Sequence, residues 1–113
     1  MAKLTSHTLN GIDGSHASFI PVLLEHVKSK KVIFDDKMDN EGRLSVEIDP
    51  SDLISEDTYQ LVFNVSDYWK ERNLFHSEML NEIIIRLTVN DIDGTYHIPV
   101  IMSPNSYSVW KSS

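Results

Sequence analysis

The strongest constraint on the fold of this chain is the recurrence of apolar residues at every second position within short runs. Residues 43–49 show the pattern clearly, because Leu44, Val46 and Ile48 alternate with charged or hydroxyl-bearing side chains. Successive side chains of a β-strand point to opposite faces, so such a run predicts a strand with one apolar and one polar face. Residues 83–90 repeat the pattern. The chain is therefore expected to fold into half-buried strands.

Turn-forming residues separate these runs. The segment 39–42 ends in Gly42, which can take a positive φ angle, and residues 91–94 predict a hairpin turn. Ser66 predicts the start of one short helix that extends to Arg72. The expected strands comprise residues 3–10, 20–26, 32–34, 43–49, 58–65, 83–90, 95–102 and 107–111. Seven or eight strands with one short helix are typical of an all-β antiparallel β-sandwich.

Length and composition narrow the class of protein further. A chain of 113 residues is expected to form a single domain, residues 1–113, and 41% hydrophobic with 24% charged residues is typical of a soluble globular protein. The net charge of −7 argues against a nucleic-acid partner, because phosphate binding needs a basic surface. The absence of cysteine excludes disulfides and thiolate chemistry. No signal-peptide stretch or bilayer-spanning run is present, so no membrane partner is expected.

Two histidines lie inside expected strands, where an apolar or β-branched residue is the ordinary choice. They are His7 and His97, and because imidazole titrates near neutral pH they are candidates for acid–base chemistry. Alternation turns His97 outward together with Pro99 and Ile101, and an apolar outer face can mark a surface that another subunit covers. Taken alone, each histidine, like Arg43 at the start of its strand, has a structural explanation more often than a functional one.

Other motifs carry less chemistry. His16, His26 and His76 are explained by turn or surface positions, and the acidic residues at 35–36 and 91–93 belong to turns. The sequence contains no metal-ligand spacing, no Gly-rich phosphate loop and no nucleophile elbow. Neither a metal nor another cofactor is therefore expected.

Five blocks fall in a characteristic order along the chain. They are Leu4-Thr5-Ser6-His7-Thr8-Leu9-Asn10, Ile20-Pro21-Val22, Asn40-Glu41-Gly42-Arg43, Tyr96-His97-Ile98-Pro99-Val100-Ile101-Met102-Ser103-Pro104 and Tyr107-Ser108. Together they resemble the 5-hydroxyisourate hydrolase branch of the transthyretin family. The resemblance implies a transthyretin (prealbumin)-like β-sandwich of two four-stranded sheets, with a short helix after the fifth strand. It also implies a homotetramer, a dimer of dimers with sites in the channel between dimers, and the expected location is the cytoplasm.

The reaction implied by this resemblance is the hydrolysis of 5-hydroxyisourate to 2-oxo-4-hydroxy-4-carboxy-5-ureidoimidazoline, by water attack on a cyclic amide carbonyl. His7 and His97 would orient and deprotonate the water and shuttle its proton. Arg43 would bind the anionic substrate and stabilise oxyanion charge, since its guanidinium offers a flat fork of donors. Arg43 would also hold a nearby imidazole neutral, because a cation disfavours a second positive charge.

The chain departs from this family at its C-terminal tail. The family enzyme ends in a Tyr-Arg-Gly-Ser tetrapeptide that reaches into the site, and the aligned residues here are Trp110, Lys111, Ser112 and Ser113. Trp110, Lys111 and Ser113 are the candidates to bind substrate there, without the phenol and the guanidinium fork. Phe19 stands where the family has glycine, and Thr95 where it has a further histidine.

Several alternatives share this sequence pattern. A non-enzymatic transthyretin-like small-molecule binding protein would have the same fold, but that branch lacks the set of His7, Arg43 and His97 that this chain has. A hydrolase acting on another cyclic ureide is compatible with the altered tail. A protein-interaction sandwich would be a monomer with no affinity for ureides.

Overall fold

The computed structural model describes residues 1–72 and 80–112. Within these ranges the chain forms eight strands, a 3-10 helix η1 (Pro50–Asp52) and a single α-helix α1 (Ser66–Glu71). The strands are β1 (Ala2–Asn10), β2 (Pro21–His26), β3 (Val32–Lys37), β4 (Arg43–Ile48), β5 (Asp57–Asn64), β6 (Glu82–Val89), β7 (Thr95–Ser103) and β8 (Ser106–Val109). The predicted all-β sandwich with one short helix after the fifth strand is confirmed.

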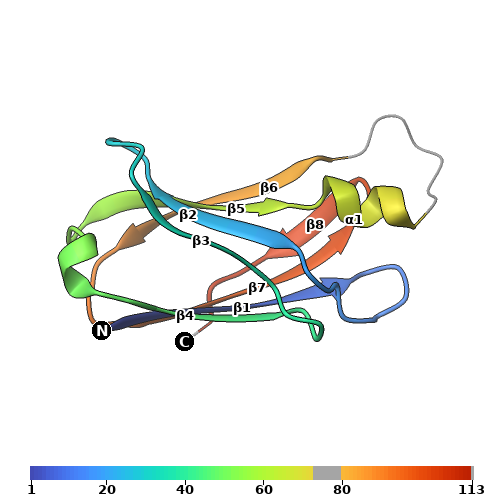
Figure 1. The fold of residues 1–113 in the computed structure, drawn as a ribbon, viewed down its shortest axis with the longest axis horizontal. Coiled ribbons are helices and arrows are strands. Elements are labelled where there is room, and N and C mark those ends of the chain that lie inside the picture. Colours follow the sequence, from blue (N-terminus) through green and yellow to red (C-terminus); the bar gives the residue numbers. More distant parts are fainter. Residues whose placement is uncertain (73–79, 113) are drawn as a thin grey trace.

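The strands form two four-stranded sheets that lie face to face, in the orders β4-β1-β7-β8 and β3-β2-β5-β6 (Figure 1). All neighbouring strands are antiparallel except β1 and β7, which run parallel. This parallel pair is the one exception to the antiparallel arrangement of the predicted sandwich. Most of the chain, including the whole second sheet, separates β1 from β7, so no hairpin imposes an antiparallel arrangement on them.

The core lies between the two sheets and is filled by alternate residues of the strands. Leu44 and Ile48 are buried and Val46 packs against the core, as the period of two predicted. On β6 the expected inward residues Ile83 and Val89 are buried as well. The helix α1 closes one end of the sandwich. The largest side chains that are fully buried include Trp69 of α1 and the β5 residues Tyr59, Phe63 and Leu61.

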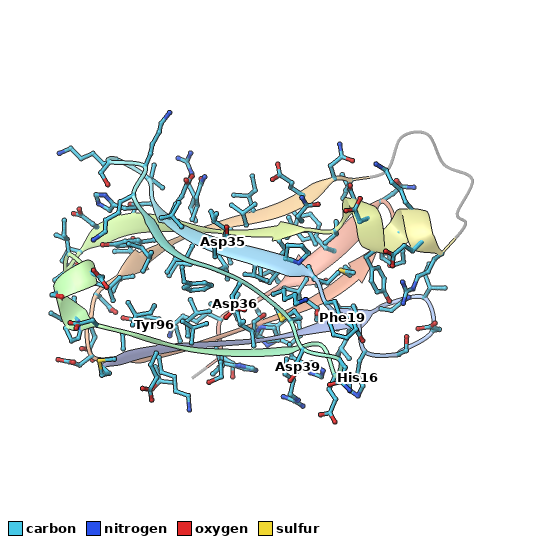
Figure 2. All side chains as sticks on the ribbon, viewed as in Figure 1. His16, Phe19, Asp35, Asp36, Asp39 and Tyr96 are labelled. Atoms are coloured by element: carbon cyan, nitrogen blue, oxygen red, sulfur yellow. The ribbon has the colours of Figure 1, made fainter. Side chains whose placement is uncertain are left out.

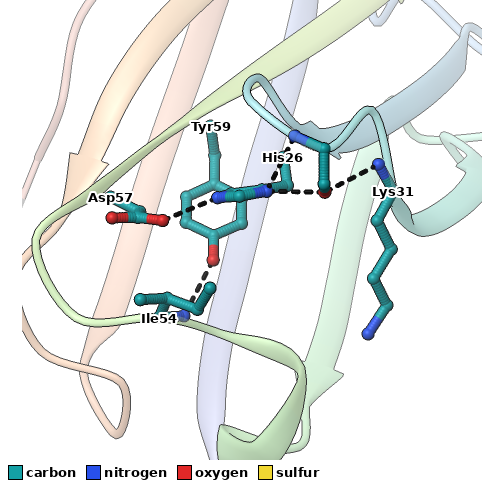
Figure 3. Close-up of polar contacts among 6 residues, drawn as sticks. His26, Lys31, Ile54, Asp57 and Tyr59 are labelled. Carbon is teal, nitrogen blue, oxygen red and sulfur yellow. Dashed lines mark hydrogen bonds and ion pairs between the residues drawn. The ribbon is translucent and has the colours of Figure 1, made fainter.

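The hairpin between β2 and β3 is tied to the start of β5 by a buried histidine (Figure 3). His26 is only 6% exposed, although its place beside a turn had suggested a turn or surface residue. Its Nδ1 lies 2.6 Å from the Ser29 hydroxyl and accepts the Ser29 N–H, and its Nε2 lies 2.7 Å from Asp57 Oδ2. Because Nδ1 accepts a backbone N–H, Nε2 is the nitrogen that donates to the carboxylate. His76 lies outside the described residues.

The last strand ends earlier than the sequence indicated. Residues 107–111 were expected to be extended, but β8 stops at Val109, which pairs with Val100. The next residue along, Trp110, faces Pro99 of β7 and donates its N–H to the Pro99 carbonyl over 3.4 Å. Because proline has no backbone N–H, Pro99 cannot donate a second hydrogen bond back to Trp110. The pairing of β8 with β7 is therefore weaker from this position onward. No helix among the described residues is long and apolar enough to cross a membrane.

Candidate functional site

The outer face of the sheet β4-β1-β7-β8 brings together the three side chains singled out in the sequence. Arg43 of β4 lies opposite His7 of β1 in the register, and His7 lies opposite Pro99 of β7. One step along β1 on the same face, Thr5 lies opposite His97. Since residues two apart on a strand share a face, His7, Arg43 and His97 occupy two adjacent rows of one surface. The topology therefore assembles residues that are 90 positions apart in the chain.

A tight turn sets the position of Arg43. Gly42 has a φ angle of +69°, and a Cβ atom on it would lie 2.5 Å from the Thr8 carbonyl oxygen, so only glycine fits. The carboxylate of Asp39 then accepts the backbone N–H groups of Arg43 at 2.9 Å and of Glu41 at 2.8 Å. These bonds, the Arg43 N–H foremost, lower the pKa of Asp39. The turn predicted at residues 39–42 therefore fixes the position at which Arg43 starts β4 opposite His7.

A pocket of about 350 Å³ opens beside this turn. It is lined by Thr5, Ser6, Asp39, Arg43, Leu44, Ser45 and His97. The polar groups include a guanidinium, an imidazole and hydroxyls, while Leu44 gives an apolar wall. Such a set can hold a small, flat, oxygen-rich anion, with bidentate hydrogen bonds from the arginine.

The imidazole of His97 is oriented by a hydroxyl on the neighbouring strand. Thr5 Oγ1 lies 2.8 Å from His97 Nδ1 in a part-buried contact. This bond engages Nδ1 and so turns Nε2 toward other partners. The contact joins adjacent strands of the same sheet, which makes the ring position a consequence of the β1–β7 register.

His7 sits in a setting that disfavours its charged form. Burial has the largest effect in lowering its pKa, followed by the positive charge of Arg43 and by His16, while a hydrogen bond with the Glu41 backbone opposes them. A neutral imidazole can accept a proton, as a general base must. Arg43 thus shifts the pKa of this imidazole in the direction that the family resemblance implied.

The C-terminal tail runs past the same surface. The Ser112 N–H donates to the His97 carbonyl over 2.8 Å, so the tail follows β7 beside the pocket. Trp110 alternates with the inward-packing Val109 and thus lies on the outer face beside Pro99, 44% exposed. Lys111 faces the other way, with its ammonium 5.7 Å from the centre of the Tyr96 ring, so the structure does not bring it to the pocket. Ser113 lies outside the described residues.

Three residues of the site were not predicted from the sequence, namely Thr5, Asp39 and His16. Thr5 could have been found, because it precedes His7 by two positions and must share its face. Asp39 was recognised only as part of a turn. His16 gave no signal, yet its Nδ1 lies 3.0 Å from His7 Nε2. Pro99 is buried on the outer face rather than exposed there, while Ile101 is 39% exposed.

Comparison with known proteins gives a consistent result. A family model described as HIUase/Transthyretin family matches residues 4–112. The chain is 30% identical over 113 residues to the 5-hydroxyisourate hydrolase of Deinococcus radiodurans, covering 97% of this chain and 95% of that protein. It is 29% identical over 117 residues to the 5-hydroxyisourate hydrolase of Pseudomonas aeruginosa, covering 100% and 93% of the two chains.

Solved structures agree on the fold. The 5-hydroxyisourate hydrolase of Klebsiella pneumoniae superposes with a TM-score of 0.81 at 16% identity, over 100% of both chains. An (S)-allantoin synthase superposes with the same TM-score of 0.81 at 23% identity, covering 99% of this chain and 44% of that one. At these identities the likeness establishes the arrangement of the two sheets.

Proposed function

The chain belongs to the HIUase/Transthyretin family, and on that premise we propose that it hydrolyses 5-hydroxyisourate to 2-oxo-4-hydroxy-4-carboxy-5-ureidoimidazoline. Relatives that align over nearly their whole length carry the name of this hydrolase. The non-enzymatic, transthyretin-like binding protein considered above is not favoured by these relatives.

The observation that carries the proposal is the gathering of His7, Arg43 and His97 on one outer face beside a pocket. In the proposed reaction, Arg43 binds the ring oxygens and stabilises the negative charge that develops as water adds to the amide carbonyl. His7, whose environment keeps it neutral, accepts a proton from that water. His97, held at Nδ1 by Thr5, orients the water or returns a proton to the leaving nitrogen. No metal enters this scheme.

The assembly and the tail belong to the same proposal. We infer a homotetramer, a dimer of dimers in the cytoplasm, in which the outer face of β4-β1-β7-β8 lines a channel between dimers. The exposed Ile101 and Trp110 on this face support that assignment, because apolar surface of this kind is commonly covered. Trp110 would form part of the substrate wall beside Pro99. Ser113 remains a predicted contributor, whereas Lys111, whose ammonium faces the Tyr96 ring, is not assigned to this wall.

The ultraviolet decay of 5-hydroxyisourate, generated in place from urate and urate oxidase, tests the proposal directly. Its rate is measured with the parent protein, with His97→Ala and with Thr88→Ala, an exposed position on the opposite sheet. We expect fast decay with the parent and Thr88→Ala proteins and a loss of about 10²–10⁴-fold for His97→Ala. Decay at the background rate with the folded parent protein would refute the proposed activity.

A further inference from the structure

His16 is held against β1 by the way the β1–β2 connection folds back on the strand. Ala17 donates its N–H to the Thr8 carbonyl at 2.9 Å, and the Thr8 hydroxyl donates to the Ala17 carbonyl at 2.7 Å. His16 itself forms an isolated bridge with Leu9. On the other side of His16, the Ser15 carbonyl accepts the Asn10 N–H at 2.8 Å. Backbone bonds therefore flank His16 on both sides and fix the position of its ring.

The ring of His16 faces that of His7 through nitrogen atoms. His16 Nδ1 lies 3.0 Å from His7 Nε2, and the ring centres are 5.2 Å apart. One proton fits between two nitrogens at this distance, since two N–H groups would point at each other. The two imidazoles therefore share one proton across this contact. Figure 2 shows His16 near Asp39, at the end of the molecule where the β1–β2 and β3–β4 connections meet.

The two rings of the pair differ in how well they hold positive charge. His7 is half-buried next to the Arg43 guanidinium, whereas His16 is exposed. A charge that forms on His7 is stabilised by moving to the outer ring, where water solvates it. A proton is therefore expected to move from His7, beside the pocket, to His16, which is exposed to solvent.

We propose that His16 is a positioning residue of the site, through which His7 passes the proton of the attacking water to solvent. This inference rests on the proposed hydrolysis. Opening a cyclic amide to a carboxylate and an N–H group consumes one water, of which one proton stays on the leaving nitrogen and the other is released. An exit for that second proton is what the pair provides.

The proton balance of the step runs through both rings. One O–H bond of water breaks as its oxygen bonds to the carbonyl carbon, and that proton binds His7 at the ring nitrogen that does not face His16. As the tetrahedral intermediate collapses, the C–N bond breaks, and the remaining hydroxyl proton moves to the leaving nitrogen, which leaves a carboxylate. The shared proton then moves from His7 Nε2 to His16 Nδ1, and His16 Nε2 releases its own proton to solvent. Both imidazoles end neutral, and a proton exchange or ring turn restores the starting tautomers. The Glu41 backbone stabilises His7 while it is protonated.

Charged groups from the neighbouring strands and turn act on His7. Arg43 faces His7 from β4 and His97 acts on it from β7, and both lower its pKa, as His16 does. Asp39 from the β3–β4 turn supplies negative charge that His7 in turn feels. Removing His16 is therefore expected to raise the pKa of His7, while Arg43 continues to lower it.

Two variants separate proton transfer from simple support. His16→Asn places an amide where Nδ1 stood, so it keeps a hydrogen bond to His7 but cannot take up and release a proton near neutral pH. His16→Ala removes both the hydrogen bond and the proton transfer. Ile12→Asn, an exposed position in the same connection, serves as the matched control. For each protein, kcat is measured against pH and against added imidazole buffer. The pKa of His7 is followed by nuclear magnetic resonance titration.

We expect His16→Asn and His16→Ala to lose kcat by about tenfold, less than the ~10²–10⁴-fold of a direct acid or base, and to regain it with imidazole. If His16→Asn is as active as the parent protein, or if added imidazole does not restore the lost activity, the proton relay is refuted. His16 would then have only a structural role beside His7. The His7 titration needs no substrate. If the parent protein is inactive, the proposed function fails, whereas an unchanged His7 pKa in His16→Ala refutes the proton-sharing pair itself.

Discussion

Phe19 offers a test of backbone strain that is independent of the chemistry. Its φ angle is +61°, in the left-handed region where a side chain with a Cβ atom is disfavoured by roughly 1–2 kcal/mol and glycine is not. Family resemblance places a glycine at this position. The Phe19 N–H donates to the Asp39 carbonyl at 3.2 Å, so the strained residue also links the two connections that frame the site.

The magnitude follows from three contributions. Replacing Phe19 by alanine keeps the strain and removes a ring that is 56% exposed and lies 5.6 Å from the Lys37 ammonium, a loss of about 0.5–1 kcal/mol. Replacing it by glycine removes the strain as well, but the unfolded chain gains freedom worth about 0.4–1 kcal/mol. Phe19→Gly should therefore be about 1 kcal/mol more stable than Phe19→Ala, and close to the parent protein.

Urea unfolding of the three proteins at one protein concentration measures this difference, because association would otherwise shift the midpoint. Thr88, an exposed residue of β6 that pairs with Thr58 of β5, provides the matched control. There, glycine should be about 0.5–1 kcal/mol less stable than alanine. If Phe19→Ala equals or exceeds Phe19→Gly in free energy of unfolding, the reasoning from the φ angle is refuted.

Three further predictions concern the site. Gly42→Ala puts a Cβ atom 2.5 Å from a backbone oxygen, and should lower the free energy of unfolding by about 2 kcal/mol or more in urea titrations, with loss of activity. Thr5→Val removes the hydroxyl from His97 at nearly constant volume. It should lower kcat by roughly tenfold, the equivalent of one hydrogen bond, with an unchanged circular dichroism spectrum. Arg43→Gln should raise the pKa of His7 in a nuclear magnetic resonance titration and move the acid limb of kcat/KM to higher pH.

The pKa shift of His7 also has a consequence for stability. Because its pKa is lower in the folded protein than in the unfolded chain, the unfolded chain binds more protons in the interval between the two values. The free energy of unfolding therefore falls as the pH drops from about 6.5, the ordinary histidine value, toward the folded value. Arg43→Gln should reduce this dependence, which urea titrations at several pH values measure. An unchanged slope would contradict the assigned cause.

Periodicity alone was enough to predict most strands of this fold. The inward residues of β4 and β6 follow directly from alternation, because a sheet buries one face and the spacing of side chains on a strand is invariant. What alternation could not provide was the pairing of strands distant in the chain. The parallel β1–β7 pair, which puts Thr5 opposite His97, depends on the path of the whole intervening chain. That pairing is the reason the site exists.

The site was predictable where a residue lay on a strand and not where it lay on a connection. His7 and His97 stood out because histidine is unusual inside a strand. His16 lies in a connection whose fold depends on hydrogen bonds between Ala17 and Thr8. No pattern in the nearby sequence predicts these bonds. The extent of β8 was missed for a similar reason, because the residue that ends it, Pro99, belongs to the neighbouring strand.

Because β8 ends early, the residues that border the pocket in the tail are distinct from the residues that stabilise the fold. After Val109 the tail is joined to the sheet by single backbone bonds at Trp110 and Ser112, and neither residue contributes to the buried core. Changes in these last positions therefore alter what borders the pocket while leaving the free energy of folding almost untouched. A lineage can in this way explore new ligands through its final residues without first repairing the sandwich that carries them. The last residues of this chain, Trp110, Lys111, Ser112 and Ser113, differ from the Tyr-Arg-Gly-Ser ending of the family in a way that fits such drift.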